Sequence, residues 1–588
     1  MRKLLVYLKD YKKESVLGPL FKLLEASFEL IVPLVMAAII DQGVAFADKP
    51  YILKMCLVLV LLAVIGLVCS ITAQYFAAKA AVGFSTGLRH ALFEHIEKLS
   101  FSEMDTVGTS TLITRMTSDV NQVQNGVNLV LRLFLRSPFI VFGAMIMAFT
   151  IDVKAALVFV VAIPLLSIVV FGIMFISIPL YKKVQGALDK VLGITRENLT
   201  GARVIRAFNK EEDEIKNFNA QNETLTAAQV YVGKISALMN PVTYVIVNGA
   251  IVALVWTGAL RVENGFITQG EVVALVNYMS QILVELVKLA NLIINVNKSI
   301  ACGNRIQAVM ELEPSIKDKD AAAAEVSGTA KGGEEKEKSF AVEFSHVGLT
   351  YAGAGEESLT DIHFAVKKGE TVGIIGGTGS GKSSVVNLIP RFYEATAGSV
   401  LVDGKDVREY SLKELRDKVG VVLQKAVLFK GTIRENLAWG NGAATEQEMT
   451  EALRIAQAKE FVEAKEGGLD FEIEQGGKNL SGGQRQRLTI ARALVKRPEI
   501  LILDDSASAL DFATDAALRK AIREMEGETT VFIVSQRAAS IRHADKIVVL
   551  DDGVIVGLGT HEELLSGCEV YQEIYYSQFK KAAGGEQA

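Results

Sequence analysis

The sequence predicts a membrane protein with two unlike parts, an all-α polytopic membrane domain followed by an α/β domain. The chain has 588 residues, of which 50% are hydrophobic and only 22% are charged, and that length predicts more than one domain. Long runs without any charged residue occur only in the first half. From Phe340 onward, short β-branched runs alternate with helical stretches, which is typical of a mostly parallel sheet covered by helices. The net charge of −5 predicts no basic surface for nucleic acid.

Six membrane helices are predicted. A helix needs about 20 apolar residues to cross a bilayer, and the uncharged runs Met55–Ala78, Ala155–Tyr181 and Ile235–Leu260 are long enough. A weaker apolar run that contains a few charges lies next to each of these three. The six spans form three hairpins and cover about residues 16–40, 55–78, 129–151, 155–181, 235–260 and 266–294.

The loops predict the orientation of these helices. The segments at residues 79–128 and 182–234 are long and rich in Lys and Arg, whereas the other connections are short. The excess of positive charge places both long loops and the N-terminus in the cytoplasm. Helical periodicity continues into both loops, so we expect the membrane helices to extend well beyond the bilayer.

Acidic residues occur within the weaker spans. Glu25 and Glu29 lie four residues apart on one helix face, and Glu285 and Lys288 are close enough in sequence to pair. An acid at membrane depth should face a cavity or a partner helix. Glu29 and Glu285 therefore either contact a substrate or proton path or brace helix packing. For Glu25 we favour packing.

Composition changes abruptly after the membrane domain, which we assign to residues 1–313. Residues 314–339 are mostly Ala, Gly, Lys and Glu, and this composition predicts a flexible linker. The α/β domain follows at 340–582, and residues 583–588 form a tail.

A phosphate-binding loop opens the α/β domain. Gly376–Ser383 reads GGTGSGKS, fits the pattern G-x-x-x-x-G-K-[ST], follows an apolar strand and precedes a helix. Glycines let backbone N–H groups surround phosphates, Lys382 reaches the β- and γ-phosphates, and the Ser383 hydroxyl ligates Mg²⁺. A second strand ends in Asp504, placed to support the magnesium, and Asp505, next to the site of an attacking water.

A short motif, Leu480-Ser481-Gly482-Gly483-Gln484, lies between these two elements. Six membrane spans, a phosphate loop, LSGGQ and an Asp-Asp strand, in this order, resemble an ABC exporter half-transporter. The resemblance covers nearly the whole chain. It implies that the α/β domain is an ATP-binding cassette, that ATP and Mg²⁺ bind there, and that two such domains close head to tail over two ATP molecules.

The resemblance also implies roles for particular residues. Tyr351 matches the aromatic residue that stacks on adenine, and Gln424 matches the glutamine that touches Mg²⁺. Segments near Thr109–Thr117 and Leu199–Phe208 look like coupling helices that touch the nucleotide domains. The implied nucleotide-binding residues are Tyr351, Gly376, Gly377, Thr378, Gly379, Ser380, Gly381, Lys382, Ser383 and Ser384; Ser481, Gly482, Gly483 and Gln484 face the partner's ATP; Ser508, Ala509, Leu510 and Asp511 form the loop between the two sites; and Ser383, Gln424 and Asp504 bind the metal.

Two positions depart from the family pattern. Asp505 stands where the family has a catalytic glutamate, and Gln536 stands where it has a switch histidine. Asp is one methylene shorter than Glu, and a placement error near 1 Å can cost on the order of 100-fold in rate. Gln can hydrogen-bond a phosphate but has no titratable proton. His543 is not a plausible substitute. Gln475, before LSGGQ, also replaces an acid found in many members.

These departures predict a subunit with a degenerate site. It resembles one half of bacterial heterodimeric multidrug exporters, whose partner half-transporter carries the Glu and His. We expect an exporter of hydrophobic or amphipathic small molecules, drugs above all, in the lipid bilayer of a bacterial plasma membrane, with the nucleotide domain and both termini cytoplasmic. The alternatives are a lipid flippase, a slow homodimeric exporter, or an ATP-gated membrane protein without transport. An intact LSGGQ speaks against the last.

Overall fold

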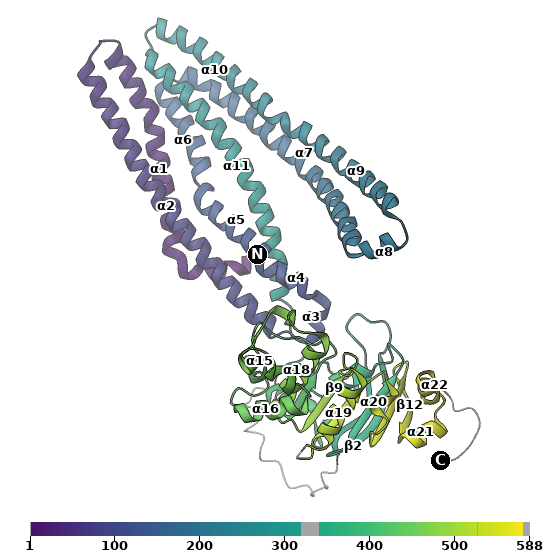
Figure 1. The fold of residues 1–588 in the computed structure, drawn as a ribbon. Coiled ribbons are helices and arrows are strands. Elements are labelled where there is room, and N and C mark those ends of the chain that lie inside the picture. Colours follow the sequence, from purple (N-terminus) through teal and green to yellow (C-terminus); the bar gives the residue numbers. More distant parts are fainter. Residues whose placement is uncertain (1, 319–339, 526, 580–588) are drawn as a thin grey trace. The chain divides into compact units, whose positions relative to one another are not determined.

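The computed structural model describes residues 2–318, 340–525 and 527–579. It divides into two compact units (Figure 1). The first unit consists of Met1–Glu97 and Thr109–Leu312, and the second of Lys98–Gly108 and Glu313–Ala588. The predicted linker overlaps the second unit, because Ile316 and Asp318 hydrogen-bond to it: the Ile316 N–H donates to Ser100 Oγ over 3.1 Å, and Asp318 Oδ1 accepts from the Leu412 N–H over 2.9 Å. Residues 319–339 of the linker and the tail at 583–588 lie outside the described residues.

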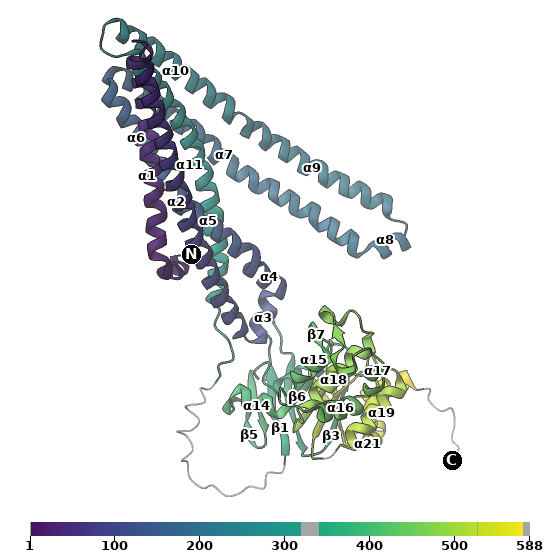
Figure 2. The ribbon, with the colours of Figure 1, turned by 60° about the vertical axis from the view of Figure 1, so that its left-hand side comes forward.

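The first unit is entirely helical. Its elements in chain order are η1 (Arg2–Tyr11), α1 (Lys12–Ala38), η2 (Ile39–Val44), α2 (Lys49–Glu97), α4 (Thr109–Thr114), η3 (Arg115–Asp119), α5 (Val120–Leu133), α6 (Arg136–Ile151), α7 (Val153–Thr200), α8 (Ala202–Ala207), α9 (Glu211–Ala237), α10 (Met239–Glu263) and α11 (Gln269–Met310). Figures 1 and 2 both show α7 and α9 side by side along most of their length, joined through α8.

Six helical segments of the described residues are long and apolar enough to cross a membrane, which confirms the predicted number. They are Lys3–Val44, Lys49–Glu97, Thr109–Ile151, Val153–Thr200, Glu211–Glu263 and Gln269–Met310. Each is longer than the predicted span, in line with helices that continue past the bilayer. The buried core between them is made of small, aliphatic and aromatic side chains such as Ala144, Ile282 and Phe159.

The third span differs from its prediction, which was one continuous helix over residues 129–151. The structure ends α5 at Leu133 and begins α6 at Arg136. Pro138 explains the break, because it has no N–H to donate to the Phe134 carbonyl and its ring would clash with that carbonyl in a continuous helix. Arg136 is thereby placed in the first turn of a new helix.

The second unit is built on a six-stranded sheet in the order β12-β11-β3-β10-β9-β6. Neighbours are parallel except for β12, which pairs antiparallel with β11 at one edge. A separate antiparallel sheet, β2-β1-β4-β5, was not foreseen from the alternation of strands and helices. The strands are β1 (Phe340–Leu349), β2 (Leu359–Lys367), β3 (Thr371–Gly376), β4 (Ala397–Val402), β5 (Lys405–Asp406), β6 (Val419–Val422), β7 (Gly431–Thr432), β8 (Glu472–Ile473), β9 (Ile500–Asp504), β10 (Thr530–Val534), β11 (Lys546–Asp551) and β12 (Val554–Gly559).

Helices cover these sheets. They are α3 (Phe101–Val107), α13 (Lys382–Leu388), η4 (Val407–Glu409), α14 (Leu412–Lys418), α15 (Ile433–Ala438), α16 (Glu446–Ile455), α17 (Lys459–Glu463), η5 (Gly468–Asp470), η6 (Gln475–Gly477), α18 (Gly482–Val495), α19 (Phe512–Arg523), α20 (Ala538–Ile541), α21 (His561–Gly567) and α22 (Glu569–Gln578). One buried cluster joins the antiparallel sheet to one face of the parallel sheet, and a second joins the helices to the other face. The carboxyl ends of β3, β6, β9 and β10 therefore meet at one edge, where ligands bind in such sheets.

Candidate functional site

The phosphate loop lies between β3 and α13 and requires glycine at several positions. Gly379 and Gly381 have φ of +86° and +89°, in the left-handed region. A Cβ on Gly376 would lie 2.1 Å from the Leu550 carbonyl oxygen, and one on Gly381 would lie 2.6 Å from a Leu359 methyl group. Any larger residue would open the loop, so these glycines set its curvature.

Lys382 lies inside this loop. Its ammonium donates to the Gly376 and Gly377 carbonyl oxygens, and the distance to Gly376 O is 3.1 Å. Burial lowers the pKa of Lys382, although Asp504 and Asp505 nearby favour the charged form. The loop thus presents a cation and a run of backbone amides to one space.

Oxygen atoms suited to Mg²⁺ converge beside the loop. Ser383 Oγ donates to Asp504 Oδ1 over 2.9 Å, and Asp504 is 5% exposed at the end of β9. Burial raises the pKa of Asp504, and the Asp505 charge adds to that effect. Among the described residues no three His, Cys, Asp or Glu side chains form a metal cluster. One carboxylate and one hydroxyl fit Mg²⁺, which is usually bound by one or two carboxylates together with substrate phosphates.

The two departing positions lie at the same edge. Asp505 follows β9 with φ of +44°, and its N–H donates to the Val534 carbonyl over 3.0 Å. Gln424 Nε2 lies 3.5 Å from Asp505 Oδ2. Asp505, Gln536 and Gln424 line one cavity of about 790 Å³ together with Tyr351 and the phosphate loop. His543 does not line that cavity, as the sequence led us to expect.

Tyr351 stands at the rim of the same cavity. Its hydroxyl donates to Ser384 Oγ over 2.8 Å, and its ring meets the Tyr393 ring edge to face, with centroids 5.0 Å apart. Burial raises the pKa of Tyr351. Sequence reasoning missed Tyr393. The sequence does place Tyr393 shortly after the phosphate-loop helix, and this position could have indicated an aromatic residue near the site.

The LSGGQ residues do not line this cavity. Ser481 caps α18, since its hydroxyl accepts from the Gln484 N–H over 3.3 Å while Gln484 Oε1 accepts from the Ser481 N–H over 3.0 Å. This capping box satisfies amides at the helix start. Gly483 lies against the neighbouring loop, because a Cβ there would be 3.2 Å from the Ala509 carbonyl oxygen. Within one chain, the signature motif is thus adjacent to residues 508–511 and separate from the phosphate loop.

The residues just before the predicted coupling segment belong to the sheet unit. Thr109–Thr117, for which we expect a coupling role, lies in the helical unit, and Lys98–Gly108 lies in the sheet unit. The Phe101 ring of α3 packs on the Phe392 ring with centroids 4.6 Å apart, and the Asp105 carboxylate accepts from the Tyr393 hydroxyl. The capping pattern of Ser100 and Glu103 was the signal for this helix.

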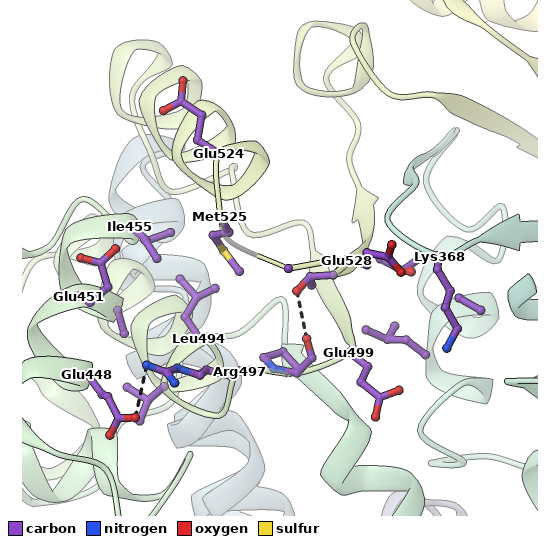
Figure 3. A pocket seen from close by; sticks show the side chains of 18 of the residues that line it. Lys368, Glu448, Glu451, Ile455, Leu494, Arg497, Glu499, Glu524, Met525 and Glu528 are labelled. Atoms are coloured by element: carbon purple, nitrogen blue, oxygen red, sulfur yellow. Dashed lines mark hydrogen bonds and ion pairs between the residues drawn. The ribbon is translucent and has the colours of Figure 1, made fainter.

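A second cavity, of about 710 Å³, opens at the opposite edge of the sheet, near the amino ends of β9 and β10 (Figure 3). Several of its charged residues pair with one another: Arg497 lies 3.3 Å from Glu448, and Arg454 lies 2.6 Å from Glu451. None of the motif residues line it. We therefore assign the chemistry to the cavity at the carboxyl edge.

The membrane acids form a buried network in the helical unit. Arg136 donates to Glu285 over 2.6 Å and to Glu29 over 2.7 Å, and Ser137 Oγ donates to Glu285 over 2.8 Å. Lys288 pairs with Glu285 over 2.8 Å, as its spacing predicted. The side chain of Glu285 is 3% exposed, whereas that of Glu29 is 40% exposed.

Glu25 belongs to a separate pair. The Lys22 ammonium lies 2.6 Å from Glu25 and also donates to Ser70 Oγ over 3.2 Å. Lys22 thus joins α1 to α2, and Glu25 pairs with Lys22 within α1.

Comparison with known proteins identifies the family to which the two units belong. Residues 15–286 match the ABC transporter transmembrane region, and residues 359–508 match the ABC transporter family. An uncharacterised ABC transporter ATP-binding protein of Mycobacterium tuberculosis is 37% identical over 98% of both chains. A putative multidrug export ATP-binding/permease protein of Bacillus subtilis is 32% identical over 98% of this chain and 99% of its own length. An ATP-dependent lipid A-core flippase of Desulfotalea psychrophila is 34% identical over 83% of this chain and 84% of its own.

One solved structure shares the fold across nearly the whole chain. A bacterial Atm1-family ABC exporter with ATP bound superposes with a TM-score of 0.78 at 23% identity, covering 97% of this chain and 100% of the other. A multi-pass helical membrane unit fused to a sheet unit with a phosphate-loop site defines an ATP-hydrolysing transporter. The chain belongs to the ABC transporter family, and it is an ABC exporter half-transporter.

Proposed function

We propose that this chain is the degenerate-site half of a heterodimeric exporter that moves amphipathic small molecules, drugs above all, out across a bacterial plasma membrane. Its nucleotide unit and both termini are cytoplasmic, and the bilayer surrounds its six spans. ATP is held at Tyr351 and the phosphate loop, with Mg²⁺ at Ser383, Gln424 and Asp504. The observation that carries the proposal is that Asp505 and Gln536 line the cavity of the phosphate loop.

The chemistry of these two residues supports slow hydrolysis. A general base must lie roughly 2.6–3.2 Å from the water that it polarises. The shorter Asp505 side chain withdraws its carboxylate from the position that a glutamate would reach, and Gln424 Nε2 lies 3.5 Å from that carboxylate. Gln536 can donate a hydrogen bond to a phosphate but cannot carry a proton between groups. The chain keeps an intact LSGGQ, which would complete the competent site on the partner.

The pair can be tested by isolating the tagged chain from its native membrane and weighing the intact complex. A second polypeptide of similar size, with Glu and His at the matching positions, is the expected result. A complex that contains only the 63.7 kDa chain would contradict the heterodimer. In that case Asp505 and Gln536 would be present at both sites, and a slow homodimeric exporter would replace the proposal.

Restoring the family residues tests the chemistry separately. The double variant Asp505→Glu with Gln536→His should raise turnover at this site on the order of tenfold or more, because it returns a base of the right reach and a titratable switch. Asp505→Glu alone should give a smaller gain. Unchanged hydrolysis at this site in the double variant would refute a degenerate site.

The transported substrate has a second candidate. The resemblance to a lipid A-core flippase supports a lipid substrate moved by the same machinery, while the resemblance to a multidrug export protein supports drugs. ATP turnover measured in vesicles separates the two. Stimulation by cationic or neutral amphipathic drugs supports drug export, and stimulation by lipids alone supports a flippase.

A further inference from the structure

The loop that carries Gln536 is held from outside the site by the last helix of the sheet unit. Gln578, the final residue of α22, donates from Nε2 to the Gln536 carbonyl oxygen over 2.7 Å. Its Oε1 accepts from the Ala538 N–H over 2.9 Å. One side-chain amide thus satisfies a backbone acceptor and a backbone donor on either side of Arg537. Reversing the amide would oppose two oxygens and two N–H groups, so the pattern has one consistent orientation.

The helix that presents Gln578 is firmly seated. Tyr571 on α22 is fully buried, and its hydroxyl lies 2.8 Å from His561 Nδ1 on α21, which lies beside α22 in Figure 1. Near the helix end, the Tyr575 and Phe579 rings stack with centroids 4.7 Å apart. A side chain fixed on a packed helix can hold a loop in place more precisely than one on another loop.

The same loop reaches the segment that communicates between the two ATP sites. The Arg537 guanidinium points at the carbonyl oxygens of Ala507, Ser508 and Leu510, each 3.4 Å from a guanidinium nitrogen. It also lies over the Phe512 ring at 5.0 Å. A movement of the backbone at 536–538 would therefore shift Arg537 against residues 507–510.

We propose that Gln578 is a positioning residue of the nucleotide site. Its amide fixes the backbone of the loop at 535–538, and so sets both the direction of the residue at position 536 and the placement of the 507–511 segment through Arg537. The role does not depend on whether this site is slow, because the 507–511 segment also serves the second site. If Gln578 has no positioning role, the proposed heterodimer with one slow site still stands. If the heterodimer proposal fails, the role of Gln578 still stands.

Three variants of the full-length chain in its membrane complex test the role. Gln578→Ala removes both hydrogen bonds. Gln578→Glu keeps the acceptor for the Ala538 N–H but places a carboxylate oxygen against the Gln536 carbonyl. Gln572→Ala is the matched control, since Gln572 lies on the same helix and its Nε2 donates to the Leu565 carbonyl over 2.9 Å, away from the loop.

The readouts are amide hydrogen exchange, ATP turnover and ATP affinity in lipid nanodiscs. In Gln578→Ala, exchange in residues 535–541 and 507–511 should rise roughly tenfold, the effect of losing two ordinary hydrogen bonds. The kcat for ATP should fall about three- to tenfold, while the Kd for MgATP changes less than twofold, since Tyr351 and the phosphate loop are untouched. Gln578→Glu should lower kcat as well, and Gln572→Ala should behave like the unaltered protein.

Three results would overturn the proposal. Unchanged exchange in Gln578→Ala would show that the two hydrogen bonds do not hold the loop. Faster exchange with unchanged kcat would show that the loop position does not matter for turnover. Equal effects in Gln578→Ala and Gln572→Ala would assign both to the docking of α22 and leave no specific role for Gln578.

Discussion

Arg136 of α6 and Glu285 of α11 form an ion pair of 2.6 Å in which both side chains are more than nine-tenths buried. Arg136 also holds Glu29, so one guanidinium joins three helices. Burying charge is costly unless partners compensate it, and removal of one partner leaves the other unpaired. Arg136 makes these contacts from the first turn of α6.

Loss of this arginine should destabilise the protein strongly. Arg136→Met removes the cation shared by Glu285 and Glu29 and leaves Glu285 with Lys288 as its charged partner. We expect a loss of about 3 kcal/mol in the free energy of unfolding, the lower end for a broken buried pair. Glu285→Gln should cost less, because Arg136 keeps Glu29. Thermal unfolding of the full-length chain in detergent measures both. Lys210→Met is the control, since the Lys210–Asp213 pair is largely exposed; a similar loss there would contradict the role of burial.

Glu29, at the exposed end of this network, can be used to test whether these acids contact substrate or only support helix packing. Glu29 is far more accessible than Glu285, so a cationic ligand could reach it without entering the core. If Glu29 contacts substrate, Glu29→Gln should raise severalfold the concentration of a cationic drug that half-maximally stimulates ATP turnover. The response to a neutral drug should stay the same. A lowered thermal stability with both drug responses unchanged would assign Glu29 to packing.

The pKa of Asp504 predicts how acid affects metal-dependent binding. Only the carboxylate form ligates Mg²⁺, and burial raises its pKa in the folded chain. A raised pKa means that the folded state favours the proton, so this group adds stability as the pH falls through its folded pKa. As the pH falls, Mg²⁺ should therefore cease to improve ATP binding. This loss should begin at a pH above about 3.9, the ordinary pKa of an aspartate.

Asp504→Asn provides the test of that assignment. Nucleotide binding measured with and without Mg²⁺ across acidic pH should show no metal advantage at any pH in this variant. Asp552→Asn is a suitable control, because Asp552 lines the same cavity and its side chain lies outside the proposed metal ligands. A variant with Asn at 504 that retained full Mg²⁺ dependence would remove Asp504 from the metal site.

A close approach on α2 makes a further stability prediction. A Cβ added to Gly83 would lie 2.0–2.5 Å from three Tyr11 ring atoms. Gly83→Ala should therefore force the Tyr11 ring away and cost about 1–3 kcal/mol, as overpacking does. Gly66→Ala, on the same helix with nothing within 4 Å, should be neutral or slightly stabilising. Thermal unfolding of the two variants should differ; equal melting temperatures would contradict the contact.

The sequence predicted most reliably what depends on local pattern. The six spans followed from apolar length, and the phosphate loop followed from glycine spacing next to a strand and a helix. The break at Phe134 was foreseeable from Pro138 in principle, yet the apolar run around it favours one continuous span. Local sequence pattern was thus sufficient to predict the helices and the phosphate loop, but not the break within a helix.

Contacts between distant segments could not be predicted. Arg136 meets Glu285 across 149 positions, and Gln578 meets Gln536 across 42. Neither pair leaves a spacing signature, since the partners lie on different elements whose packing the sequence does not state. The placement of α3 could not be predicted for the same reason: it lies between two membrane helices in sequence, and its contacts with Phe392 and Tyr393 assign it to the sheet unit.

The membership of Lys98–Gly108 in the sheet unit has a practical consequence for anyone who expresses that unit as a soluble fragment. A fragment starting at Glu313 lacks α3, so Phe392 and Tyr393 lose the ring and carboxylate that cover them. Uncovered aromatic surface promotes self-association. Such a fragment would need the 98–108 segment supplied as a peptide or fused ahead of it to remain monodisperse. Without that segment, Tyr351 would pack on a Tyr393 ring that has lost its own support.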